Sequence, residues 1–275
     1  MKGWRRVGDR FEVDWADAVW TFGFAEGRAG LLREGASGPF LALVGLAAVG
    51  RRDDAAFTAD SLVDVDVVHG RLLATFEPPG WHGLTVRAGW GPCRDGRGMD
   101  LEIQASADSV GELRRLEVMA EARPKSLVAS PPEPRFMVVP RDRVAAGSSY
   151  DGREPDALLA RLMTLEVARP SPDEALPDPG GVAADPDLGF PGAFHEIAHP
   201  DDVARDISTQ LHAAEPIRYA FFGHDLEKGV VLRGRLRGVF LAEWGATGSE
   251  RESLRSVLRL ERDRFFAEPP PLRTD

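Results

Sequence analysis

The segment at residues 99–105 alternates apolar and polar side chains with a period of two, and this pattern constrains the fold more than any other feature of the sequence. A helix would scatter the carboxylates of the segment around its circumference, whereas an extended chain places them on one face. The pattern therefore predicts a β-strand with one apolar and one polar face. The apolar members are Met99, Leu101, Ile103 and Ala105, and the polar members are Asp100, Glu102 and Gln104.

Other parts of the chain predict strands of the same kind. Residues 61–76 predict a hairpin in which Val63, Val65 and Val67 share one face. Consecutive strands about ten residues apart, without helices between them, indicate antiparallel meanders. We therefore expect an all-β protein of two large antiparallel sheets packed face to face. The remaining segments predicted as strands are 84–90, 229–241 and 113–121, of which the last also fits a helix and is assigned by its β-rich surroundings.

The length of 275 residues suits one large β domain, and we expect residues 1–275 to form a single β-sandwich domain. Residues 169–191 are rich in Pro, Asp and Gly. They predict a long irregular excursion rather than a domain boundary, because too little chain follows them to form a second β core. Ser249 and Glu252 have the spacing of a capping box, so a C-terminal α-helix is predicted at 249–266.

Charge and cysteine content argue against several classes of function. The 34 Lys and Arg residues and 44 Asp and Glu residues give a formal net charge of −10, which argues against binding to nucleic acid or to anionic membranes. Cys93 is the only cysteine, so no intrachain disulfide forms and the chain suits a reducing compartment. The longest apolar run, near residues 40–49, is too short to span a bilayer. We expect a soluble cytoplasmic protein.

His195, Glu196 and His199 match the H-E-x-x-H motif of zinc hydrolases. On a helix this spacing places two histidine ligands one turn apart, with the glutamate as base. Pro200 follows the motif directly and biases His199 away from helical geometry. A zinc-dependent hydrolase is therefore kept as an alternative function. The favoured interpretation is a strand or loop that ends in a turn, without a metal.

Two further groups of residues are candidates for a binding site. Arg233 and Arg235 belong to an arginine stripe on one face of the strand at 229–241. The stripe either lines a site for an anionic or hydroxyl-rich ligand, or forms a solvated or ion-paired outer face. Trp81 and His82 follow a proline-rich turn. Trp81 either stacks on a sugar ring or covers one end of the core, and His82 can transfer a proton near neutral pH.

The segment at 64–105, the segment at 221–230 (Phe-Phe-Gly-His-Asp-Leu-Glu-Lys-Gly-Val) and the strand at 233–240 together resemble bacterial proteins of the galactose mutarotase-like superfamily. The resemblance is diffuse and covers roughly residues 14–241. It implies an antiparallel β-supersandwich with one concave sheet that binds carbohydrate. It also implies a sugar mutarotase or epimerase that needs no cofactor, or a carbohydrate-binding or interaction module that has lost the reaction.

Aldose mutarotases use a histidine acid and a glutamate base on the concave sheet, and the resemblance carries these roles to particular residues of this chain. His82 or His199 would be the acid and Glu227 the base. Opening a sugar ring needs a proton donor at the ring oxygen and an acceptor at the anomeric hydroxyl, on opposite sides of the ring. The residues expected to hold the sugar are Arg87, Arg233, Arg235 and Trp81.

Overall fold

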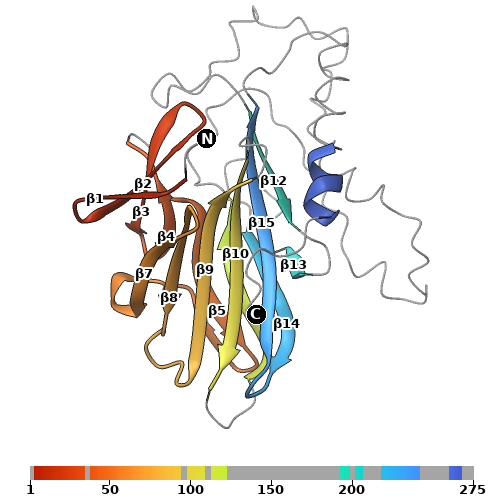
Figure 1. Cartoon of the computed structure of the whole chain (residues 1–275). Coiled ribbons are helices and arrows are strands. Elements are labelled where there is room, and N and C mark those ends of the chain that lie inside the picture. The colour runs from red at the N-terminus through yellow and green to blue at the C-terminus, as the bar shows by residue number, and fades with distance from the viewer. Residues whose placement is uncertain are drawn as a thin grey trace, which may run out of the picture.

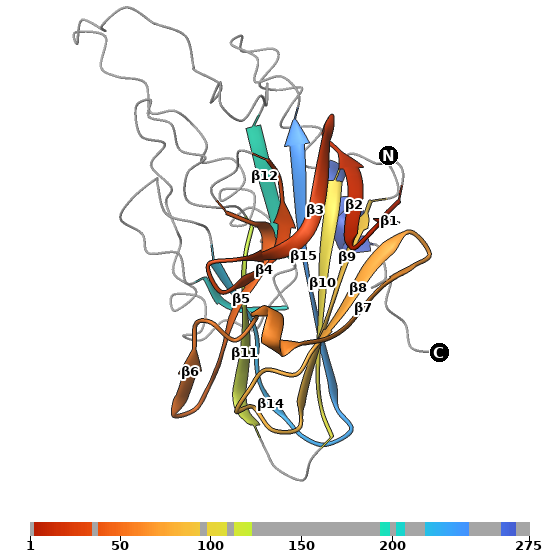
Figure 2. The same ribbon diagram turned by 90° about the vertical axis from the view of Figure 1, so that its left-hand side faces the viewer.

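The computed structural model shows an all-β protein built from two antiparallel sheets that pack face to face (Figures 1 and 2). Each pairing between neighbouring strands is antiparallel. This confirms the predicted antiparallel β-sandwich. The residues that the structure describes are 3–34, 38–93, 98–108, 113–122, 193–198, 202–206, 218–241 and 260–267.

One sheet has nine strands in the described part of the chain and contains the first six of them, β1 to β6. Eight of its strands follow one path, and β6 (Arg51–Asp53) pairs with β5 outside that path. In spatial order the eight are β1 (Arg5–Val7), β2 (Arg10–Trp15), β3 (Ala18–Ala25), β4 (Arg28–Leu32), β5 (Phe40–Ala48), β11 (Leu113–Glu121), β14 (Arg218–Leu226) and β13 (Val203–Asp206).

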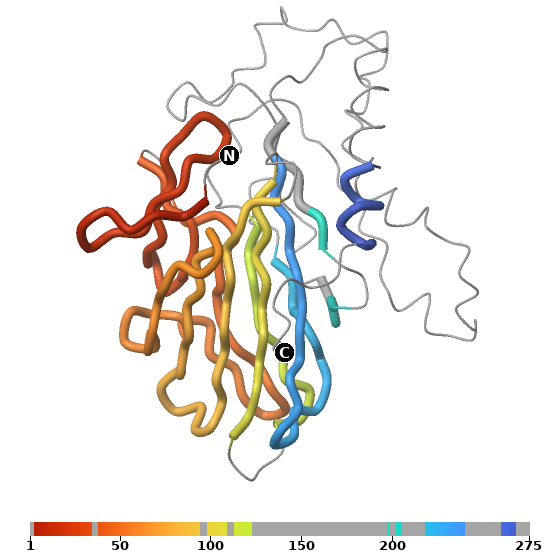
Figure 3. The backbone as a smooth tube through the Cα atoms, in the orientation of Figure 1, coloured from red at the N-terminus to blue at the C-terminus, as the bar shows by residue number. Residues whose placement is uncertain are grey.

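The other sheet has six strands among the described residues, and its long central strands run side by side (Figure 3). A short 3₁₀ turn at Ala59–Ser61 leads into its edge strand β7. All the segments predicted as strands from the alternation pattern are strands in the structure. In spatial order the six are β12 (Ala193–Ala198), β15 (Val231–Leu241), β10 (Gly98–Ala107), β9 (Leu84–Pro92), β8 (Arg71–Phe76) and β7 (Leu62–Val68).

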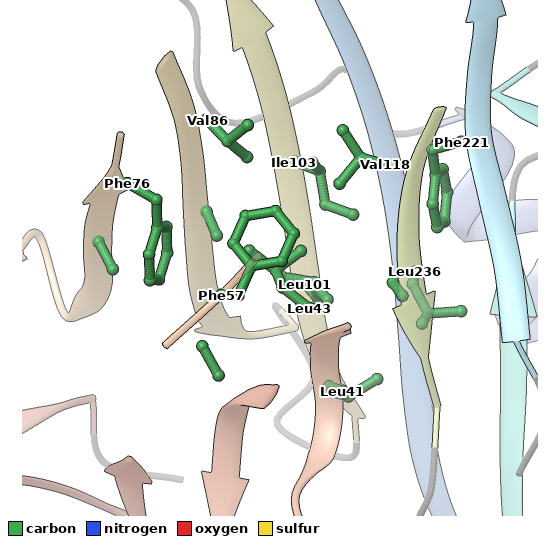
Figure 4. Packing of buried hydrophobic residues seen from close by; sticks show 14 of the residues in the cluster. Leu41, Leu43, Phe57, Phe76, Val86, Leu101, Ile103, Val118, Phe221 and Leu236 are labelled. Atoms are coloured by element: carbon green, nitrogen blue, oxygen red, sulfur yellow. The ribbon is translucent and has the colours of Figure 1, made fainter. Parts of the chain in front are cut away.

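The core fills the space between the two sheets, and residues from both sheets belong to one cluster (Figure 4). Leu101 and Ile103 of β10 belong to this cluster, as the alternation pattern of 99–105 requires, and Ile103 lies beside Val118 of β11. The indole N–H of Trp90 in β9 donates to the backbone oxygen of Leu41 in β5, with 2.8 Å between the two atoms. This bond joins the two sheets inside the apolar layer.

The hairpin of β7 and β8 differs from its prediction at one residue. Val65 and Val67 pack against the core as expected, but the side chain of Val63 is 57% exposed. The pairing register shifts between Leu62 and Asp64, which is the mark of a β-bulge. The extra residue turns Val63 outward and directs Leu62 toward the core instead.

Asp202 links the two sheets at the edge where β12 ends. Its carboxylate accepts a hydrogen bond from the backbone N–H of Arg235 in β15 (3.1 Å), and its backbone oxygen accepts one from Phe222 in β14 (2.8 Å). Close by, a Cβ atom at Gly234 would come within 2.7 Å of the Phe221 ring. Glycine is therefore required where β15 approaches the other sheet, in agreement with the close approach that its glycines predicted.

A short helix at 260–267 lies against the outer side of the six-stranded sheet, where it contacts Arg235 and Arg237 of β15 (Figures 1 and 2). This confirms the C-terminal part of the predicted helix at 249–266. Residues 249–259 and the predicted excursion at 169–191 lie outside the described residues. No helix in the described part is long and apolar enough to cross a membrane.

Candidate functional site

The strand register aligns charged and polar residues in rows across β9, β10 and β15. Residues directly opposite each other in an antiparallel sheet project to the same side. Since Leu101 and Ile103 of β10 point into the core, the polar residues between them belong to the outer face. The rows on this outer face are Arg87–Gln104–Arg233, Glu102–Arg235 and Asp100–Arg237.

The exposed fraction of the arginine side chains falls from one end of this face to the other. Arg87 is exposed and Arg233 is half-buried, whereas Arg235 is only 5% exposed and Arg237 only 1%. Gln104, between the first two, is buried although it is polar. The outer face therefore has an open end near Arg87 and a closed end near Arg237, beneath the helix at 260–267.

At the closed end, Arg237 and Asp100 form a buried ion pair. The Arg237 Nε and Nη2 atoms donate to the two carboxylate oxygens of Asp100 at 2.6 and 2.9 Å, which is the two-point geometry preferred by guanidinium and carboxylate. The Arg237 Nη1 atom also lies 3.8 Å from a carboxylate oxygen of Glu261 in the helix. Cys93, whose Sγ atom is 3.5 Å from Asp100 Oδ1, lies beside this pair.

In the middle of the face, Arg235 contacts the helix through Phe265. Its Nη2 atom donates to the backbone oxygen of Phe265 at 2.9 Å, and its guanidinium lies over the Phe265 ring, 4.5 Å from the centroid. The other amino nitrogen, Nη1, is buried and has no hydrogen-bond partner among the described residues. Arg235 thus already binds both an oxygen acceptor and a flat ring.

A glycine on β9 leaves room for Arg71 to reach the buried carboxylate of Glu102 on this face. The Glu102 side chain is fully buried, and its Oε2 atom lies 3.5 Å from Arg71 Nη2. Arg71 reaches it from β8 by crossing over Gly91 in β9. A Cβ atom at Gly91 would come within 2.6 Å of Arg71 Nη1, so glycine is needed at this crossing.

His82 and Glu227 lie at the same end of the sandwich, where β10 ends. Asp108 donates its backbone N–H to the oxygen of Gly83, next to His82, at 3.0 Å. On the other side of β10, the residue after Glu227 forms an isolated bridge with Ala107. Both His82 and Glu227 are exposed. Their backbones flank β10, so about two strand spacings, or roughly 10 Å, separate them.

Trp81 does not offer a stacking surface. It is 2% exposed and belongs to the core cluster, so the structure shows it in the role of covering the end of the core. The guanidinium of Arg51 lies over its ring at 3.8 Å from the centroid. The burial favours the second of the two interpretations of Trp81, a cover for one end of the core, over stacking on a sugar.

The H-E-x-x-H motif does not form the helix that a zinc site of this kind requires. Residues 193–198, which include His195 and Glu196, form strand β12 and pair with β15 along their whole length. Two histidine ligands four residues apart need a helical turn to converge on one metal, and residues 193–198 do not supply that turn. His199 lies outside the described residues. Among those that are described, no cluster of three His, Cys, Asp or Glu residues could hold a metal ion.

A second buried carboxylate lies on the other sheet. Glu121, the last residue of β11, is fully buried; Arg218 donates to its Oε1 atom, and Arg28 Nη1 lies 3.2 Å from Oε2. Burial raises the pKa of Glu121 above its usual value, and the two arginines partly oppose that rise. This carboxylate lies between two cations.

Sequence reasoning missed the polar residues that accompany the arginines. Gln104, Glu102 and Asp100 served only to identify a strand, and Phe265 only to mark a helix. The alternation at 99–105 did predict a polar face on that strand, and the arginine stripe predicted a second polar face on the strand at 229–241. What the sequence lacked was the pairing of β10 with β15, which joins these two faces into one.

Comparison with known proteins assigns no family. No family model matches the chain, and no curated protein matches it. The grounds for a function are therefore the geometry of the outer face and the resemblance in the sequence.

Proposed function

We propose that the protein binds carbohydrate on the outer face of the six-stranded sheet, at its open end. The observation that carries this proposal is the row formed by Arg87, Gln104 and Arg233 on three neighbouring strands. Such a row offers fixed donors from the guanidinium groups and both a donor and an acceptor from the amide, which suits the paired hydroxyl groups of a sugar. The resemblance to the galactose mutarotase-like superfamily supports the same ligand class.

The proposed reaction, where one occurs, is the cofactor-independent opening or epimerisation of a sugar ring. His82 would protonate the ring oxygen while Glu227 takes the proton of the anomeric hydroxyl. The support for this pair is their position on either side of the end of β10, at a backbone separation that a bound ring and two side chains can span. A protein that binds sugar without this reaction is the second candidate, since both residues are exposed.

We also propose that the protein acts in the cytoplasm. The support is its one cysteine, which is buried beside Asp100 and forms no disulfide. The net charge of −10 supports a small neutral ligand over nucleic acid or anionic membranes as a partner.

Binding is tested by a thermal-shift screen with mono- and oligosaccharides, followed by calorimetric titration of the sugars that raise the melting temperature. Arg87→Ala should weaken binding about tenfold or more, because a hydrogen bond from a charged donor is lost. Arg52→Ala is the matched control, since Arg52 is an exposed arginine on β6 of the other sheet. Equal losses in both variants, or no sugar that binds, would contradict the proposal.

Catalysis is tested separately by NMR exchange between the anomers of the bound sugar. Glu227→Gln should abolish the exchange and leave the melting temperature nearly unchanged, because Glu227 is exposed and lies in a turn. Exchange at the wild-type rate in this variant would remove Glu227 from the mechanism. Sugar binding without any exchange in the wild-type protein would establish the non-catalytic candidate instead.

A further inference from the structure

We propose that the helix at 260–267 is a displaceable cover that regulates the carbohydrate site. This inference rests on the proposed function. In the docked position, the helix closes the part of the outer face that contains Arg235 and Arg237. When the helix leaves, the open row at Arg87 and Arg233 extends to Arg235, and the sugar gains a further guanidinium.

The contact between helix and sheet is mainly polar and has one aromatic anchor. Phe265 is fully buried, whereas Leu260 on the same helix is 50% exposed. The other buried helix residues in the described part are both charged: Glu261 faces Arg237, and Arg262 pairs with its neighbour Asp263. A helix held by one ring and several charges is docked more weakly than one with an apolar stripe.

Phe265 gives Arg235 the contacts that a sugar would give it. The backbone oxygen of Phe265 accepts a hydrogen bond from Arg235 at 2.9 Å, as a sugar hydroxyl would. The guanidinium groups of Arg235 and Arg237 both lie over the Phe265 ring, 4.5 and 4.9 Å from the centroid. Helix and ligand thus use the same donors of Arg235, so the two cannot bind there together.

The docked interface leaves donors unused, which favours its opening. The Nη1 atoms of Arg235 and Arg262 are both buried without a hydrogen-bond partner in the part of the chain that the structure describes. A buried donor without a partner lowers stability, because it has lost its hydrogen bond to water and has formed none within the protein. Undocking returns both groups to solvent or to a ligand.

A cover of this kind affects affinity in a defined way. If the sugar binds fully only to the undocked form, its apparent dissociation constant equals the intrinsic constant divided by the undocked fraction. A variant that weakens docking should therefore bind sugar more tightly. High salt should also favour undocking, because it screens the charges that hold the helix on the sheet.

The test compares Phe265→Ala with Leu260→Ala in the full chain. Helix docking is measured in the absence of sugar by the rate at which Cys93 reacts with a thiol reagent. Cys93 reports on docking because it lies against the Asp100–Arg237 pair. Trypsin cleavage after Arg262, which is buried while the helix is docked, is a second measure of undocking. Sugar affinity is then measured by calorimetry with a sugar found in the thermal-shift screen.

Phe265→Ala should increase both the Cys93 rate and the Arg262 cleavage rate about tenfold or more, and should lower the dissociation constant of the sugar. Leu260→Ala should change none of them, because Leu260 is half exposed. Unchanged rates in Phe265→Ala would overturn the cover, even if sugar binds. Faster rates with unchanged affinity would overturn the regulation and leave the proposed binding intact. If no sugar binds to either variant or to the wild-type protein, the proposed function fails and the regulation fails with it.

Discussion

The two faces of β10 and β15 are both buried, but they are buried in different ways. The inner face carries Leu101, Ile103 and Leu236, which lie in the apolar core between the sheets. The outer face of the same strands carries Asp100 and Arg237, which are nearly as inaccessible and form an ion pair. One strand pair therefore supports an apolar layer on one side and a charged layer on the other.

This difference shows that each face obtains its stability from a separate source. The inner face gains from removing apolar surface from water and from the close packing of its side chains. The outer face has lost the hydration of its charges, and it recovers that loss only through the close pairing of Arg237 with Asp100. The inner face should tolerate changes of shape poorly, and the outer face should tolerate unpaired charge poorly.

The largest effect is expected from breaking the pair on one side only. Arg237→Met leaves Asp100 buried without its cation and should lower the free energy of unfolding by about 3–5 kcal/mol. Urea unfolding followed by circular dichroism measures this change. Val231→Ala, at an exposed position of β15, is the control and should stay within about 0.5 kcal/mol of the wild-type protein. A loss below about 1 kcal/mol for Arg237→Met would mean that water reaches Asp100.

A cavity in the inner face should have the next largest effect. Leu101→Ala removes a fully buried side chain and should lower the free energy of unfolding by about 3 kcal/mol. The loss should be the same in low and high salt, because no charge is involved. A loss that depends strongly on salt would show that the inner face is coupled to the charges on the outer face.

Replacing both partners of the outer pair should have a small effect. The double variant Asp100→Leu with Arg237→Met removes both charges and fills a similar volume, so its stability should lie within about 1 kcal/mol of the wild-type protein or above it. Urea unfolding of the single and double variants completes the comparison. If the double variant loses as much as the two single changes together, the outer face is stabilised by something other than the pairing.

The smallest effect concerns the buried carboxylate of the other sheet. Because the pKa of Glu121 is raised in the folded protein, its contribution to stability is fully present at low pH and is lost as the pH rises through that folded-state pKa. The melting temperature of Glu121→Gln relative to the wild-type protein should therefore rise between pH 4 and pH 8. Differential scanning fluorimetry across this range measures the trend. A relative melting temperature that falls with pH would mean that Arg28 and Arg218 outweigh burial.

Local sequence patterns were sufficient to predict the all-β class and the strands at 61–76, 84–90, 99–105 and 229–241. The alternation at 99–105 predicted both the strand and which of its residues face the core. Pro200 also signalled correctly that the H-E-x-x-H segment would not be helical, because the residue before a proline avoids helical geometry. The bulge that turns Val63 outward left no such signal, since it depends on how β7 pairs with β8.

The candidate site could be predicted only in part, because its geometry depends on distant pairings. Asp100 and Arg237 are 137 residues apart in the chain, and nothing local specifies that they meet. Polarity alone suggested that the outer face was hydrated, but the helix at 260–267 buries part of it. Trp81 carried two equally good interpretations, and its burial in the core and the position of Arg51 over its ring separate them.

The central claim is that carbohydrate binds on the outer face of the six-stranded sheet. The most direct measurement is the NMR spectrum of the arginine side-chain N–H groups, recorded while a sugar from the thermal-shift screen is added. The signals of Arg87 and Arg233 should shift until the sugar saturates the site, and those of Arg28 and Arg218 on the other sheet should stay fixed. Shifts confined to Arg28 and Arg218, with Arg87 and Arg233 unchanged at saturation, would contradict it.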